Sequence, residues 1–206
     1  MEFTVKSVAA EKQRSACLAV GVFTNRKLSP SAQGLDRACG GVVSGLLRRG
    51  DLAGKTGQTL LLHNVPNLLC ERLLLVGCGK EKELNEGAYR QIIGQAVKAI
   101  TDTGASEASL YLTELDIKGR DIAWKIRHAV EAAEESLYRF DRLKSGKGDK
   151  PPHLRRLTLP VSKRGDIAAA ETAIQQGRAI SAGVTLARDL GNLPGNLCTP
   201  TYLAQQ

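Results

Sequence analysis

The sequence has 206 residues, of which 42% are hydrophobic and 24% charged, as in an ordinary folded protein with one good core. No apolar run approaches the roughly 20 residues that cross a membrane, and residues 1–15 lack the apolar region of a secretory signal. The five cysteines form no CxxC pair, which indicates buried free thiols and a cytoplasmic location.

Strand-like and helix-like runs alternate along residues 1–165. Alternating polarity predicts an edge strand over 3–8, and apolar runs predict five more strands over 16–23, 58–63, 72–76, 108–112 and 154–161. Apolar residues spaced by three and four predict helices over 31–49, 85–102 and 119–138. The short Pro66-Asn67 link predicts a hairpin between the strands 58–63 and 72–76. The sequence therefore predicts one α/β domain, with a mixed sheet flanked by helices on both faces.

A long connecting helix is predicted over 166–191, with one apolar face from Ile167 to Leu190. Asp166 is placed to cap its first turn, and Gly191-Asn192 suits a left-handed cap at its end. Thr199-Pro200 then starts another helix seven residues before the last residue. Since so short a helix is marginal alone, we expect 192–206 to be a junction and the start of a second domain in a longer protein.

Three stretches resemble the leucyl aminopeptidase (cytosol aminopeptidase) family. The most specific is Asn192–Ala204 (NLPGNLCTPTYLA), which follows the family pattern NxPxNxxTPxxLA, with Gly195 where Pro or Ser is usual. Leu74–Lys80 is similar to the family's strand and GxGK turn, and Ser136–Asp141 is similar to its YxFdxyK segment. The resemblance is to the N-terminal domain of a bacterial member, its connecting helix and its domain junction.

The resemblance implies a macro-domain-like fold without catalytic residues of its own. Members are hexameric cytosolic enzymes that release N-terminal amino acids, preferentially leucine, with two divalent metal ions such as Mn²⁺ or Zn²⁺. Their metal ligands and catalytic residues lie in the domain that follows the junction, and no position here matches those motifs. The resemblance therefore implies no catalytic residue and no metal ligand in this chain, which we expect to be inactive alone.

Two glycine-rich stretches look superficially like nucleotide-binding loops. Gly50–Thr56 (GDLAGKT) has one residue too few between its glycines, and it precedes a strand instead of following one. Gly77–Gly79 follows a strand, but Lys82 stands where a dinucleotide loop has its third glycine. We interpret the first as a tight turn and the second as a sharp strand exit.

Other patterns also lack catalytic spacing. The three histidines, His63, His128 and His153, are isolated from one another and from any HExxH motif. A surface or capping role is expected for His128. Ser44 is one residue away from the spacing of a nucleophile elbow and lies within a helix-like run, so it is not a candidate nucleophile.

Residues 139–164 hold nine basic and two acidic residues, and so most of the net charge. A solvated loop explains such a run, and contact with a duplex DNA backbone is the sharper hypothesis, since some bacterial members of the family bind DNA. The candidate DNA-contact residues are Lys144, Lys147, Lys150, Arg155 and Arg156. A role in assembly or substrate gating alone stays open.

Overall fold

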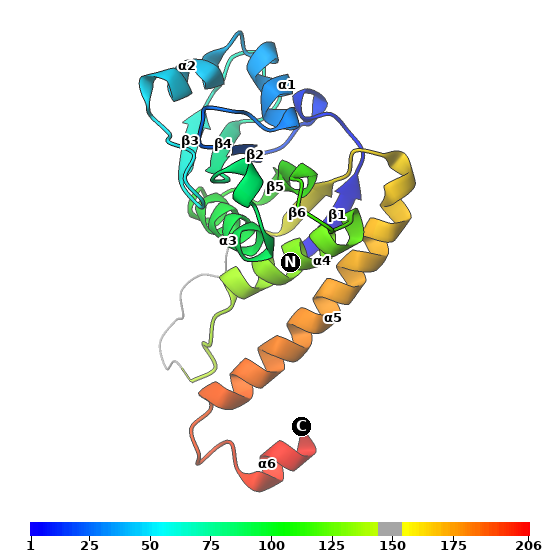
Figure 1. Cartoon of the computed structure of the whole chain (residues 1–206). Coiled ribbons are helices and arrows are strands. Elements are labelled where there is room, and N and C mark those ends of the chain that lie inside the picture. Colours follow the sequence, from blue (N-terminus) through cyan, green and yellow to red (C-terminus); the bar gives the residue numbers. More distant parts are fainter. Residues whose placement is uncertain (144–153) are drawn as a thin grey trace.

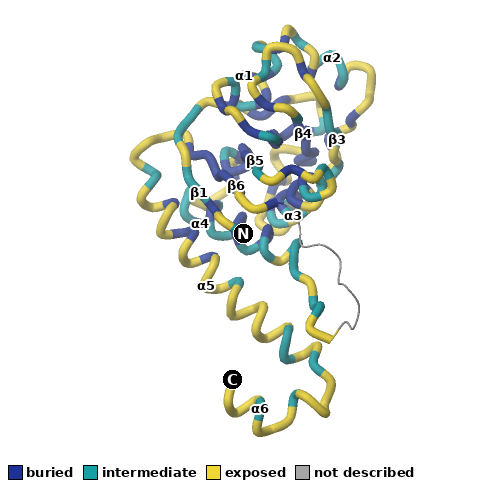
Figure 2. Tube along the Cα trace, turned by 180° about the vertical axis from the view of Figure 1, so that it is seen from behind, coloured by how far each residue is buried: buried dark blue, intermediate teal, exposed yellow. Residues whose placement is uncertain are grey.

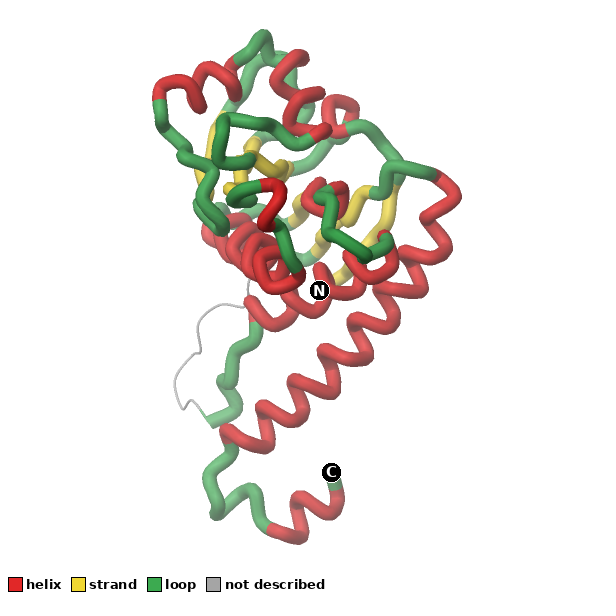
Figure 3. The backbone as a smooth tube through the Cα atoms, viewed as in Figure 1, coloured by secondary structure: helices red, strands yellow, loops and turns green. Residues whose placement is uncertain are grey.

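The computed structural model describes residues 1–143 and 154–206, in which strands and helices alternate (Figures 1 and 3). The strands are β1 (Glu2–Lys6), β2 (Leu18–Val22), β3 (Thr59–His63), β4 (Arg72–Gly77), β5 (Glu107–Leu110) and β6 (Arg156–Pro160). The α-helices are α1 (Pro30–Ala38), α2 (Val42–Arg49), α3 (Glu86–Asp102), α4 (Ile122–Leu137), α5 (Ile167–Asn192) and α6 (Pro200–Gln205). Each strand predicted from the sequence is present.

Within the described residues, the strands form one mixed sheet in the order β1-β6-β5-β2-β4-β3. β3 pairs antiparallel with β4, and the other neighbours pair in parallel. The edge position of β1 and the β3–β4 hairpin are as predicted. Parallel neighbours need crossovers, which α3, α4 and the α1–α2 segment supply.

Helices cover both faces of this sheet, as predicted. Alternate residues of β2 point to opposite faces: Ala19 packs with α3, α4 and α5, whereas Leu18 and Val20 pack with α1 and α2. Strand β4 divides in the same way, with Leu74 in the first cluster and Leu75 in the second. The larger core lies on the face of α3 and α4, and α5 adds to it only through its first half (Figure 2).

The single helix expected over 31–49 is in fact two helices, α1 and α2. Gly40 and Gly41 separate them with φ angles of 69° and 84°, in the left-handed region that glycine adopts without a steric penalty. Gly41 is the residue that precedes α2, and Ser44 donates its backbone N–H to the Asp36 carboxylate at 2.9 Å. The glycines that only weakened the predicted helix therefore end it.

The long helix is present over Ile167–Asn192, but both of its predicted caps are wrong. Asp166 belongs to a short 3₁₀ turn (Arg164–Asp166) and makes no side-chain capping hydrogen bond. Gly191 stays helical, and the helix ends at Leu193 in an extended conformation. The next helix starts as predicted, because the Thr199 side chain accepts a hydrogen bond from the N–H of Tyr202 and Pro200 follows it.

The described part of the chain offers no membrane-spanning helix. Among residues 1–143 and 154–206, none of the helices combines the length and the apolar character that crossing a bilayer requires. Although α5 has 26 residues, charged and polar side chains interrupt its sequence throughout.

Candidate functional site at the junction of the domain and the long helix

Two of the motifs that carry the family resemblance, far apart in the sequence, meet at the far end of α5. Tyr138, which ends α4, donates its hydroxyl to Oδ1 of Asp189 at 2.8 Å. Asn192 donates its side-chain N–H to the same hydroxyl at 3.0 Å. The guanidinium of Arg188 lies over the tyrosine ring, 3.8 Å from its centroid. We call Tyr138, Arg188, Asp189 and Asn192 the Tyr138 cluster.

The far half of α5 and the segment after it expose an apolar surface. The first half is buried through Ala170, Ala173, Ile174 and Gly177. Beyond Gly177 the same helix face continues into solvent at Ile180 and Val184, which are 45% and 48% exposed. Leu186, Leu197 and Leu203 extend this exposure (Figure 2). Large apolar side chains that stay exposed along one segment favour a contact surface there.

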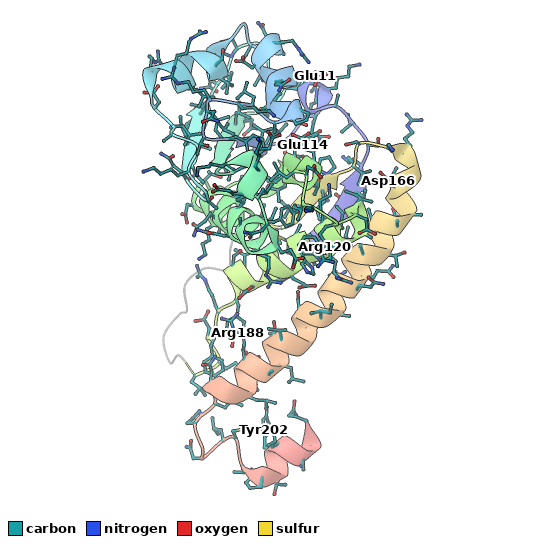
Figure 4. The ribbon with its side chains drawn as sticks, in the orientation of Figure 1. Glu11, Glu114, Arg120, Asp166, Arg188 and Tyr202 are labelled. Carbon is teal, nitrogen blue, oxygen red and sulfur yellow. The ribbon has the colours of Figure 1, made fainter. Side chains whose placement is uncertain are left out.

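The segment from 192 to 206 touches the domain at a second point beside this surface. Arg142, just after α4, approaches the Tyr202 hydroxyl of α6 at 3.5 Å. Figure 4 shows Arg188 and Tyr202 on the part of the chain that projects from the domain. The junction motif therefore lies next to the segment after α4, which the sequence separates from it by about 50 residues.

The described residues do not form a metal site. Residues 1–143 and 154–206 contain no group of three His, Cys, Asp or Glu side chains arranged to hold an ion. His63 lies exposed on β3, and His153 is outside the described residues. The chemistry of these donors therefore does not fit the two divalent ions that the family resemblance implies.

His128 is not the surface histidine that the sequence suggested. Its ring packs against the ring of Trp124 at a tilt of 48°, with the centroids 3.9 Å apart, and its side chain is 17% exposed. Burial lowers the pKa of His128, and Glu131, 3.6 Å from Nδ1, opposes this in part. His128 lies between the Trp124 ring and the Glu131 carboxylate, so it helps to pack the layer formed by α3, α4 and α5.

The two glycine-rich stretches are packed against each other and are structural. Gly57 donates its N–H to the carbonyl of Gly77 at 2.9 Å, and Gly77 donates to the carbonyl of Gln58 at 2.7 Å. Gly79 donates to the carbonyl of Gly54 at 2.8 Å. A Cβ atom on Gly77 would overlap the carbonyl oxygen of Lys55. Because these backbone N–H groups already donate to carbonyls, they are not free to bind a phosphate. The interpretation of the first stretch as a tight turn and of the second as a sharp strand exit fits this packing.

A cavity of about 240 Å³ lies at the carboxyl ends of β1, β5 and β6, beside the start of α1. Its most polar wall is Glu114, whose carboxylate accepts the N–H of Ser31 at 3.0 Å and its hydroxyl at 2.6 Å. The N-terminus of a helix attracts anions, and here the protein's own carboxylate occupies it. The sequence carried no sign of this pair, because 83 residues separate its members.

Among the described residues, basic side chains of the window lie at both ends of β6. Arg155 and Arg156 are exposed at the start of β6, and Lys163 and Arg164 are exposed beyond its other end. Arg156 pairs with Glu2 at 3.1 Å and Glu107 at 3.5 Å. The remaining DNA-contact candidates, Lys144, Lys147 and Lys150, lie outside the described residues. Contact with DNA stays a prediction.

Comparison with known proteins identifies the class of this fold. The N-terminal domain of the cytosol aminopeptidase family matches residues 19–147, which is more than half of the chain. The chain therefore belongs to the cytosol aminopeptidase family and carries its N-terminal domain. The resemblance seen in the sequence motifs is confirmed.

Solved structures agree in fold along nearly the whole chain. A point mutant of tomato leucine aminopeptidase is 25% identical, with a TM-score of 0.79 over 100% of this chain and 41% of the tomato chain. The bottromycin maturation enzyme BotP, solved in complex with Mn, is 23% identical, with a TM-score of 0.65 over 93% of this chain and 35% of BotP. This chain thus spans about two fifths or less of these relatives.

Proposed function

We propose that this chain is the non-catalytic N-terminal part of a cytoplasmic aminopeptidase that releases N-terminal residues, preferentially leucine, from peptides. Hydrolysis would use two divalent ions, Mn²⁺ or Zn²⁺, held by a part of the protein outside these 206 residues. The family membership supports a peptidase, and the lack of a metal-binding group in the described residues supports a site elsewhere. The three parts 1–165, 166–191 and 192–206 would be domain, connecting helix and junction.

The observation that carries this proposal is the apolar surface beyond Gly177. Ile180 and Val184 continue the buried face of α5 but are 45% and 48% exposed, because the domain covers them only in part. Removing exposed apolar side chains from water is favourable, so another part of the protein that covers this face would stabilise the helix. We propose that the peptidase part, in a hexamer, provides this cover.

Peptidase activity on leucine p-nitroanilide with added Mn²⁺ tests the location of the chemistry. The 206-residue chain is expected to be inactive, and the same chain extended through the reading frame after residue 206 is expected to be active. EDTA should abolish that activity. Activity in the short chain, or none in the extended one, would overturn the proposal.

Substitutions on the exposed surface test its role. In the extended protein, Ile180→Glu combined with Val184→Glu is expected to reduce assembly and activity, because two charges would be buried against the covering part. Ala182→Glu is the matched control, because it adds a charge at an exposed position of the same helix. Equal effects of the double variant and the control would argue against the covered surface.

Duplex DNA binding is kept as a separate proposal for Lys144, Lys147, Lys150, Arg155 and Arg156. Arg155 supports it, since it is exposed and forms no ion pair with the described residues. Binding should weaken steeply with salt, and reversing the charge of Lys144, Lys147 and Lys150 together should abolish it. If the triple variant binds a DNA duplex as tightly as the native chain, these lysines are not contacts.

A further inference from the structure

Helix α5 contacts the domain closely at Gly177. A Cβ atom on Gly177 would lie 2.9 Å from the carbonyl oxygen of Arg127 and 2.9 Å from Cβ of Val130, both on α4. The absence of a side chain therefore lets the two helices cross at short distance. This crossing is the last point at which α5 has buried residues, because the residues from 182 to 188 are exposed.

Beyond this crossing α5 continues away from the domain (Figure 1), and a hollow lies between α4 and α5. A cavity of about 110 Å³ lies there, lined from α4 by Glu131 and Glu134 and from α5 by Ile180, Ser181 and Val184. The Ser181 hydroxyl is buried and has no hydrogen-bond partner among the described atoms. Close packing between α4 and α5 therefore stops at the crossing, and it does not set the direction of α5 beyond that point.

The Tyr138 cluster restores contact on the far side of this hollow. Tyr138 directly follows α4 in an extended conformation, and its backbone N–H donates to the carbonyl of Glu135 in the last turn of that helix. Its partners Arg188 and Asn192 are four residues apart and so lie on one face of α5, with Asp189 next to them. Tyr138 thus contacts three side chains in the last turns of α5. Its ring lies under Arg188, and its hydroxyl donates to Asp189 and accepts from Asn192.

A simple length argument shows why a second contact matters. At 1.5 Å per residue, about 22 Å of helix separates Gly177 from Asn192. A tilt of about 10° at the crossing would therefore move the helix end by about 4 Å. A helix whose buried contacts with the domain end at Gly177 would present residues 193–206 in a wider range of positions than a helix that is also held near Asn192.

We propose that Tyr138 is a positioning residue, which pins the far end of α5 to the end of α4 and so fixes the direction of the junction segment relative to the domain. Partial burial and the Asp189 carboxylate raise the pKa of Tyr138, so its hydroxyl keeps the proton that it donates. The inference stands on the geometry of this chain, and it does not need the proposed peptidase function.

Hydrogen exchange of the 206-residue chain tests the proposal, with mass spectrometry following the amides of α5. In Tyr138→Ala, amides 182–192 are expected to exchange at least about tenfold faster, because ring and hydroxyl contacts are both lost. Tyr138→Phe keeps the ring under Arg188 and should give a smaller increase. Amides 168–177, which lie on the buried side of the crossing, should keep their native rates in both variants.

Tyr111→Phe is the matched control. It removes a tyrosine hydroxyl that also has a protein acceptor, the carbonyl of Val8 at 3.0 Å, far from the end of α5. This variant should leave amides 182–192 unchanged. The proposal is overturned if the Tyr138 variants leave amides 182–192 at native rates, or if they speed exchange equally in α4, the sheet and both halves of α5.

Discussion

At the scale of single residues, burial divides the cysteines into two groups. Cys17, Cys39, Cys70 and Cys78 are buried, and Cys198 is half-exposed beyond α5. Burial raises the pKa of both Cys17 and Cys78 to about 12. Because the thiolate is the reactive form, a thiol with that pKa has only about one part in ten thousand ionised at pH 8.

Labelling with a chromogenic disulfide reagent at pH 8 should therefore show one fast thiol per native chain. The other four should react only after the chain unfolds in urea. Cys198→Ser should remove the fast phase and leave the slow one. Fast labelling that persists in Cys198→Ser would show that one of the four buried thiols is accessible.

His128 makes the stability of the domain depend on pH. Burial lowers its folded-state pKa below the unfolded value of about 6.5, with Glu131 opposing and Arg127 and Arg90 reinforcing the shift. Below pH 6.5 the unfolded chain therefore binds a proton that the folded chain resists, so the free energy of unfolding falls as the pH drops.

Urea unfolding between pH 7.5 and 5.5 measures this dependence. His128→Gln should reduce the loss of stability over that range, because its side chain does not titrate. His63→Gln should leave the loss unchanged, since His63 is exposed on β3. Identical pH dependence in native chain and His128→Gln would contradict the assignment to His128.

At the scale of whole elements, the α4–α5 crossing depends on Gly177. Gly177→Ala would force the two helices apart, and overpacking of this kind costs about 1–3 kcal/mol. Gly183→Ala is the matched control in the same helix, because nothing lies within 4 Å of its Cβ position. There the substitution should stabilise the helix by about 0.5–1 kcal/mol. Urea unfolding of both variants measures their free energies of unfolding. Changes of the same sign in the two variants would rule out the close crossing.

Local sequence patterns predicted which strands and helices are present, but they did not predict where several helices begin and end. Alternating polarity located β1, apolar runs located the other five strands, and the spacing of Tyr89, Ile92, Ile93 and Ala96 located α3. The helix expected over 31–49 failed because a Gly-Gly pair can continue or end a helix, and only tertiary packing decides which. The cap assigned to Asp166 failed because the 3₁₀ turn gives this residue a helical backbone conformation, whereas a capping residue is typically extended.

The candidate site was less predictable than the fold. The motifs around Tyr138 and Asn192 were visible, but nothing in the sequence paired them, because 54 residues separate the two side chains. The same applies to Glu114 and Ser31. The Tyr138 contacts arise from the way in which α4 and α5 pack, and the Glu114–Ser31 contact joins the turn after β5 to the start of α1. Hydrophobic periodicity predicts the apolar face of a helix but not the element that packs against it.

At the scale of the whole molecule, two hydrophobic clusters share one sheet. The larger includes the single tryptophan, Trp124, and the smaller lies under α1 and α2 around Leu35 and Leu47. Strands β2 and β4 contribute alternate residues to both clusters, so neither cluster can lose its strands without exposing the other. The domain is therefore expected to unfold as one cooperative unit.

A substitution on one face, observed from the other, tests this coupling. Leu47 is 2% exposed on α2, and Leu47→Ala should cost about 2–5 kcal/mol, as large-to-small core changes do. If the sheet couples the two faces, Trp124 fluorescence should report the full shift of the urea midpoint, equal to that seen by circular dichroism. Leu69→Ala, at a 48% exposed position, should shift neither signal by more than about 0.5 kcal/mol. A Trp124 transition that stays in place while the circular dichroism shifts would mean that the α1–α2 layer melts alone, and that the strands do not transmit its loss.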